Sequence, residues 1–308
     1  MAQEPRSPAP RSDERALPTA RAASPCHMHS DLARAALAEN VTIPTLPSVV
    51  RRINELLEDP DASLRDVGCE IAQDAPISTK LLRLANSSVY GTRERVLSTE
   101  HAASVLGMRV IRNLVLQSAV IAKFDHLRSV KGFDFDGLWR HAVVTALIAR
   151  QLTKRAKVQL NWDPEEAYTC ALLHDIGKVV LLDGAPEPYA GLIRAAAESG
   201  RPLYSLEREV IGLDHAEVGA RVLESWGLDA SLIAVVRNHH APKTKVLRFP
   251  ALCLVALADQ TATRVALDRA DEAREGLSGT LGRTLGFAPE QIDPFVEFAF
   301  QAYTQAVV

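Results

Sequence analysis

The sequence predicts an all-α fold with two packed helical bundles, and three observations support that prediction. From about residue 45 onward, apolar residues recur at the three- and four-residue spacing of amphipathic helices. No segment shows the sustained alternation of apolar and polar residues, bounded by turn-forming residues, that predicts a strand. The stretch SVKGFDFDG at residues 129–137 breaks the helical pattern and separates the two bundles.

The composition is that of a globular protein and argues against several classes of partner. Of 308 residues 47% are hydrophobic and 24% charged, and a net charge of −3 gives no electrostatic reason to expect nucleic acid or an anionic membrane as partner. No apolar run reaches the length of a membrane-spanning helix, and the N-terminus lacks the apolar core of a secretory signal. The four cysteines are scattered, as expected for free thiols in a reducing compartment. We therefore expect a cytoplasmic protein.

The chain divides into a tail, two subdomains and an extension. Residues 1–35 are rich in Pro, Ala, Ser and Arg, lack hydrophobic periodicity, and are expected to form a disordered tail. Residues 36–130 are predicted to be the N-terminal helical subdomain, and residues 131–265 the second helical subdomain. Residues 266–308 are a C-terminal helical extension, whose last amphipathic helix is expected to start near Pro289.

The first bundle is predicted to hold about five helices and to end near Phe124. The second helix opens at Ser63, which has the spacing of a capping box with Asp66. The third is expected to stop at Gly91, because glycine readily adopts the left-handed conformation that ends helices. The first helix shows one apolar stripe, formed by Val49, Val50, Ile53, Leu56 and Leu57.

The stretch ALLHDIGKVVLL, residues 171–182, places a histidine and an aspartate side by side inside an apolar run of the second bundle. Its helix is predicted to start with Asp163 as N-cap and Pro164 in the first turn. Such groups are costly to bury unless something pairs with them. Further histidines and one further aspartate occupy helix ends or core faces of the same bundle. The whole set is His141, His174, Asp175, His215, His239, His240 and Asp259.

These residue types on different helices favour a metal site, because facing helices supply the ligands of sites in a bundle core. Imidazole and carboxylate together bind first-row divalent metals, and the two oxygens of Asp175 could bridge two ions. Lys178 follows on the same side of the helix, where it is either a phosphate contact or an ordinary surface lysine. A lone histidine is usually a satisfied core or surface residue, and we interpret His101 and His126 in that way.

The order H…HD…H…HH…D of this set resembles the HD superfamily of metal-dependent phosphohydrolases, and HDIGK is similar to the central motif of its HD-GYP branch. Three stretches resemble the HDOD domain, the HD-related output domain of bacterial signalling proteins. They are residues 43–91 (IPTLPSVV to SSVYG), 102–116 and 213–242 (LDHAEVGARV to RNHHAP). The resemblance covers about residues 40–265 and leaves the tail and the end of the chain outside.

The resemblance implies an all-α fold and a role as an output or docking module in bacterial signal transduction, including cyclic-di-GMP networks. In HD hydrolases, residues matching His141, His174, Asp175 and Asp259 hold one metal, and those matching His215 and one or both of His239 and His240 hold a second. The sequence departs from these relatives in two places. The chain reads APKTKVLRFP after His240, without the acidic residue and Gly-Tyr-Pro loop of HD-GYP phosphodiesterases, and Gly137 replaces a carboxylate that some relatives use.

Two functions remain open at this point. The first is a regulatory protein that contacts a signalling partner and keeps a divalent metal site, with Fe, Mn, Ni, Zn and Mg all candidates. The alternative is a metal-dependent phosphohydrolase or phosphodiesterase with a nucleotide or cyclic nucleotide ligand, in which Asp175 and Lys178 would be catalytic. Direct DNA binding finds little support, because the basic stretches MRVIRN and QLTKRAK are typical of solvated helix faces.

Overall fold

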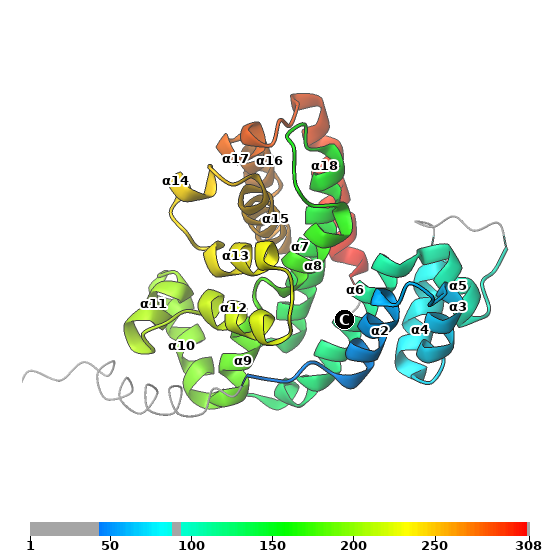
Figure 1. The fold of residues 1–308 in the computed structure, drawn as a ribbon. Helices are drawn as coiled ribbons and strands as arrows, with labels where there is room; N and C mark the ends of the chain where they lie inside the picture. The colour runs from blue at the N-terminus through cyan, green and yellow to red at the C-terminus, as the bar shows by residue number, and fades with distance from the viewer. Residues whose placement is uncertain (1–42, 88–93, 307–308) are drawn as a thin grey trace, which may run out of the picture.

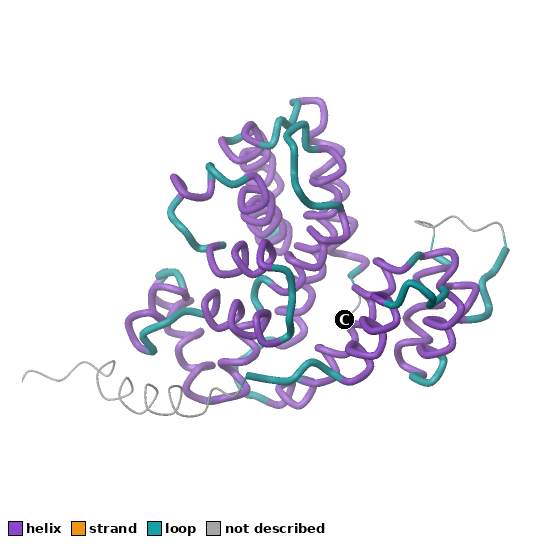
Figure 2. Tube along the Cα trace, viewed as in Figure 1, coloured by secondary structure: helices purple, strands orange, loops and turns teal. Residues whose placement is uncertain are grey.

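The structure, a computed structural model, describes residues 43–87 and 94–306. Within these ranges the regular elements are helices and no strand is found, which confirms the all-α prediction (Figures 1 and 2). The tail predicted at residues 1–35 lies outside the described residues, and the other subdomain boundaries stay predictions.

The first bundle, on the right of Figure 1, contains helices α2 to α6. They are α2 (Ser48–Glu58), α3 (Leu64–Ile71), α4 (Ala75–Ala85), α5 (Thr99–Leu106) and α6 (Met108–Lys123). The predicted capping box is present at the start of α3, because the hydroxyl of Ser63 accepts from the backbone N–H of Asp66 and the Asp66 carboxylate accepts from that of Ser63. Local sequence therefore fixes where this helix begins.

The third helix ends earlier than predicted, at Ala85, and Gly91 lies outside the described residues. Asn86 follows the helix, and its amide donates to the carbonyl oxygens of Leu82 and Val96 at 2.8 Å each. The Asn86 side-chain oxygen also accepts from the Val96 backbone N–H at 2.8 Å. The Asn86 amide thus binds both the last turn of α4 and the chain approaching α5.

The second bundle carries all the candidate ligands and has α7 at its centre, packed against α8 and α15 (Figure 1). A short 3-10 helix, η1 (Asp125–Ser129), connects it to α6. Its helices are α7 (Phe135–Arg155), α8 (Pro164–Leu173), α9 (Ile176–Gly184), α10 (Pro186–Ser199), α11 (Leu203–Val210), α12 (His215–Ser225), α13 (Ala230–Asn238), α14 (Lys243–Val246) and α15 (Pro250–Ala266).

Residues 270–305 form further helices that cover one side of the second bundle. The last helix follows a 3-10 turn that starts at Pro289, and this helix packs against α7 and α15. The elements are α16 (Ala270–Ser278), α17 (Thr280–Thr284), η2 (Pro289–Gln291) and α18 (Ile292–Gln305).

The two bundles are held together by polar contacts as well as by a shared core. Residues 43–47, which we call the strap, run from beneath α9 to the start of α2 (Figure 1). The indole N–H of Trp226, at the end of α12, donates to the strap carbonyl of Pro44 at 2.6 Å. Between α6 and α8, the Tyr168 hydroxyl donates to Gln117 at 3.0 Å.

No single helix in the described ranges is long and apolar enough to cross a membrane. The consecutive helices α5 and α6 would reach that length and apolarity only when taken together, and they meet at an angle of 116°.

Candidate metal centre

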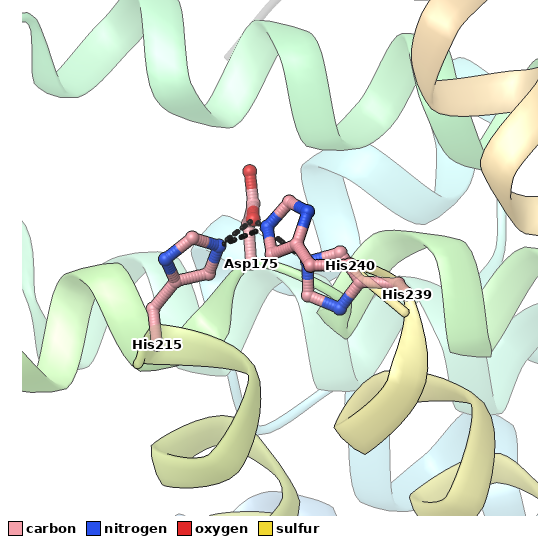
Figure 3. Close-up of side chains that lie close together, drawn as sticks. All are labelled: Asp175, His215, His239 and His240. Atoms are coloured by element: carbon pink, nitrogen blue, oxygen red, sulfur yellow. Dashed lines mark hydrogen bonds and ion pairs between the residues drawn. The ribbon is translucent and has the colours of Figure 1, made fainter. Parts of the chain in front are cut away.

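The second bundle brings all the predicted ligands into two adjacent groups. His141 lies on α7, His174 and Asp175 form the break between α8 and α9, and Asp259 lies on α15. The remaining ligands stand at helix ends, since His215 is the first residue of α12 and His239 and His240 directly follow α13. One group holds Asp175, His215, His239 and His240 (Figure 3), and the other holds His141, His174 and Asp259.

The local chain geometry explains how the His–Asp pair reaches the centre. Helix α8 starts at the predicted N-cap Asp163, which forms a capping box with Glu166, and it ends before His174. Asp175 is the N-cap residue of α9, so its carboxylate lies at the positive end of that helix. Gly177 lets α9 approach α12 closely, because a Cβ at this position would overlap the carbonyl oxygen of His215.

The first group surrounds one oxygen of Asp175. Its Oδ1 lies 3.3 Å from Nε2 of His215 and 3.7 Å from Nε2 of His239. Nε2 of His240 lies 2.7 Å from Nε2 of His215, and Figure 3 shows these two residues beside Asp175. His215 and His239 therefore direct the same ring nitrogen toward Oδ1 of Asp175, and His240 directs its own Nε2 toward that of His215.

The second group is built around Asp259 and is joined to the first by Asp175. Oδ1 of Asp259 lies 3.1 Å from Nε2 of His141 and 3.9 Å from Nε2 of His174. The other oxygen of Asp175, Oδ2, lies 3.3 Å from Nε2 of His174. Asp175 thus directs one oxygen to each group.

Outer hydrogen bonds fix which nitrogen of each buried ring carries its proton. Nδ1 of His174 lies 2.7 Å from the carbonyl oxygen of Ala171, and Nδ1 of His239 lies 2.6 Å from that of Val236. A carbonyl oxygen only accepts, so Nδ1 must donate and Nε2 of the neutral ring keeps its lone pair toward the centre. Such outer partners orient histidines that bind metals in proteins.

The centre therefore contains two buried acceptor atoms that no donor of the described residues satisfies. Oδ1 of Asp175 and Nε2 of His239 are buried and have no hydrogen-bond partner among the described residues. The short distance between His215 and His240 also needs a proton or a cation between their nitrogens. Buried polar atoms are almost always satisfied, and a nitrogen and oxygen donor set fits a first-row divalent cation. The residues present thus fit a metal ion.

The electrostatics favour the ligand form of several of these groups. Burial opposes ionisation of Asp175, but the neighbouring His174 and Lys178 outweigh it and hold the pKa of Asp175 well below its usual value. Burial lowers the pKa of His240 to about 2, helped by the neighbouring histidines His239 and His215. Burial also lowers the pKa of His239. Both adjacent histidines are therefore neutral near pH 7 and free to bind a cation.

Lys178 lies at the centre and is not a free surface lysine. Its Nζ donates to Oδ2 of Asp175 at 2.6 Å, and its side chain is 22% exposed. Burial opposes its charge, but the Asp175 carboxylate outweighs burial and raises the pKa of Lys178. The ammonium group thus neutralises the shared carboxylate in this structure.

The sequence interpretation missed a buried carboxylate, Glu207 of α11. Its Oε2 accepts from Nδ1 of His215 at 2.6 Å and from the His215 backbone N–H at 2.9 Å. Its Oε1 accepts from the hydroxyl of Tyr189, and the Glu207 side chain is fully buried. One signal could have revealed it, because Glu207 stands one helical turn after Leu203, on the apolar stripe of its helix.

One further aromatic residue lies at the centre, while two of the other described histidines lie outside it. Tyr204, also unpredicted, stacks on His240 with ring centroids 4.5 Å apart. His101 and His126 are exposed and lie outside both groups, as expected for isolated histidines. His126 pairs with Asp183 of α9 at 2.7 Å.

Solved structures with this fold come from several bacteria. A candidate phosphohydrolase from Shewanella amazonensis SB2B is 27% identical, with a TM-score of 0.68 over 89% of this chain and 99% of its own. An HDOD domain protein of unknown function from Geobacter sulfurreducens is 23% identical, with a TM-score of 0.67 over 91% of this chain and 98% of its own. The second likeness shows the fold alone.

The sequence comparisons identify the family. An uncharacterized protein of Treponema pallidum (strain Nichols) is 32% identical over 232 residues, which are 74% of this chain and 44% of that protein. This chain therefore spans less than half the length of that relative. The model of the HDOD domain matches residues 43–242, which include the first bundle, the second bundle as far as α13, and every candidate ligand but Asp259. The chain belongs to the HDOD domain family.

Proposed function

We propose that this chain is a regulatory output protein of bacterial signal transduction that acts by contacting a partner protein, and that its second bundle holds a divalent metal ion. The observation that carries the metal is the ring of inward lone pairs around Oδ1 of Asp175. No donor of the described residues satisfies that oxygen. The ion would be held by the Asp175, His215, His239 and His240 group, with the His141, His174 and Asp259 group beside it.

Burial of the centre favours regulation over turnover. The side chains of His174 and His215 are 1% exposed and that of Asp175 is 5% exposed. A metal ion can occupy such a site, but a phosphodiester must bring its phosphorus and an attacking water to the ion. Lys178 is held on Asp175, which leaves its ammonium directed at the protein's own carboxylate.

A metal-dependent phosphohydrolase acting on a nucleotide is the second candidate, and one observation favours it. The second group is more open, with side chains of His141 and Asp259 that are 20% and 30% exposed. A bound metal would supply a water of lowered pKa, while Lys178 would contact the phosphate once it left Asp175. The name of the Shewanella relative is consistent with this alternative.

Metal content and turnover measured on the same samples test both candidates. Elemental mass spectrometry is applied to the purified protein, to Asp175→Ala and to Glu187→Ala, an exposed control on α10. We expect a divalent metal in the wild type and the control, its loss in Asp175→Ala, and no hydrolysis of bis(p-nitrophenyl) phosphate or cyclic dinucleotides. Metal-free wild type that folds normally would refute the metal site. Metal-dependent hydrolysis that disappears in Asp175→Ala would replace the regulatory proposal with the enzymatic one.

A further inference from the structure

A groove of about 960 Å³ lies on the first bundle, away from the metal centre. Its walls come from the strap, the first turns of α2 and α4, the last turns of α6, and η1. The volume is at the upper end of the roughly 300–1,000 Å³ typical of small-molecule pockets.

The groove is positively charged although the whole chain carries a net charge of −3. Arg51, Lys80 and Lys123 line it, and none of them forms an ion pair with a described residue. Burial lowers the pKa of Lys80, and the nearby Arg83 and Arg128 lower it further, as expected where cations gather. The lining therefore offers uncompensated positive charge to a ligand.

The acidic residues of the lining are already engaged. The Asp74 carboxylate caps α4 by accepting from the backbone N–H of Ile77 at 2.9 Å. Asp125 pairs with Arg128 at 2.6 Å, and Arg128 also pairs with Asp136. The N-terminus of α2 adds positive potential to the same wall, because its N-cap residue Pro47 supplies no side-chain acceptor.

The rest of the lining is aliphatic. Leu46, Val49, Ile77 and Ile121 contribute apolar surface, and none of the lining residues is aromatic. A nucleobase would find no ring on which to stack. Aliphatic side chains between cations instead match a peptide that carries leucine-like residues next to carboxylates.

Both ends of the groove are connected to helices that begin with metal ligands. The strap wall is fixed to Trp226, at the end of the helix that opens with His215. The η1 wall is fixed through His126 to Asp183 of α9, the helix capped by Asp175. An occupant of the groove would therefore touch the strap and η1, which are both bonded to the second bundle.

From these contacts we infer that the groove binds an acidic, amphipathic segment of a partner protein. The inference rests on the proposed role in protein contacts and names the docking surface for it. Carboxylates of the segment pair with Arg51, Lys80 and Lys123, and its apolar side chains cover the aliphatic wall.

The test uses three synthetic peptides of one length, built from leucine with glutamate, glutamine or lysine, labelled for fluorescence anisotropy. Guanosine triphosphate and pyrophosphate serve as competitors. The protein is the full chain as wild type, as the double variant Arg51→Glu, Lys123→Glu, and as the control Arg65→Glu, Arg248→Glu. The control changes net charge equally at exposed arginines that do not line the groove.

We expect the glutamate peptide to bind the wild type and the control with equal affinity, and at least tenfold more tightly than the glutamine peptide does. Its affinity for the double variant Arg51→Glu, Lys123→Glu should be at least tenfold lower. Equal binding of the glutamate and glutamine peptides, or equal loss in the two double variants, would overturn the inference. Binding of the nucleotide or pyrophosphate alone would reassign the groove to a phosphorylated small molecule. Metal content of the same samples separates the proposals, because a loaded centre with no peptide binding refutes the groove alone.

Discussion

Replacing Glu207 by glutamine separates its contribution to metal binding from its contribution to folding. The glutamine side-chain oxygen can still accept from both N–H groups of His215, and its amide can donate to the hydroxyl oxygen of Tyr189. The variant therefore keeps the number of hydrogen bonds and removes only the negative charge. Charge-assisted bonds are about twice as strong as neutral ones, so we expect the metal-free variant to lose about 2 kcal/mol in free energy of unfolding.

The same variant is also expected to bind the metal more weakly. A carboxylate behind a metal-binding imidazole raises its basicity, and loss of such partners typically lowers metal affinity by about 10–100-fold. That range corresponds to about 1.4–2.7 kcal/mol of binding free energy. Competition between the protein and a chromogenic chelator for Zn²⁺ or Mn²⁺ measures the dissociation constant, and urea unfolding of the metal-free protein measures stability.

Tyr189→Phe is the matched control for this prediction. It removes one hydrogen bond to Glu207 in a buried site but leaves in place both bonds that Glu207 accepts from His215. We expect it to lower stability by about 1–3 kcal/mol and to leave the metal dissociation constant almost unchanged. A wild-type dissociation constant in Glu207→Gln would refute the reasoning, and so would an equal loss of metal affinity in the tyrosine variant.

Three further predictions follow from the same contacts. In the metal-free protein, neighbouring carboxylates outweigh burial and raise the pKa values of His174 and His215. This contribution to stability is present below about pH 6.5 and is lost as pH rises through the raised pKa values. The increase in melting temperature on adding metal should therefore grow between about pH 5 and pH 8, and a flat profile would contradict it. Gly177→Ala should lower the free energy of unfolding in urea by about 1–3 kcal/mol and weaken metal binding. Gly191→Ala, which has open space around its Cβ, should be neutral or stabilising. Equal effects of the two substitutions would show that the close approach of α9 to α12 is not the cause. Trp226→Phe should lose about 0.5–1.5 kcal/mol because the bond to the strap disappears, and unchanged stability would show that the strap is held by other contacts.

Local features of the fold were predictable from sequence, because they depend on residues close together in the chain. The capping boxes at Ser63 and Asp163 each need only one residue three positions later, and both are present. The end of α4 was not predictable in this way. Asn86 stops the helix through a contact with Val96, and nothing in the sequence near Asn86 specifies that partner.

The candidate ligands were predictable as a set, while their grouping was not. Histidines at helix ends and the resemblance to a known pattern were enough to select residues from His141 to Asp259. Division into two groups joined by Asp175 depends on the directions of individual rings, which helical periodicity does not specify. Glu207 stands on the apolar stripe of its helix, but that position does not identify His215 as its partner, so its place at the centre became visible only in the structure.

The wide separation of the ligands along the chain links the centre to the lifetime of the protein. His141 and Asp259 stand on different helices and meet only in the folded bundle, so an ion bound there stabilises the native state alone. Free metal at a hundred times the dissociation constant would add about 2.7 kcal/mol to the free energy of unfolding. Changes of about 1–2 kcal/mol can alter cellular abundance several-fold, because proteases remove unfolded chains. Scarcity of the ion would then lower the amount of this protein in the cell.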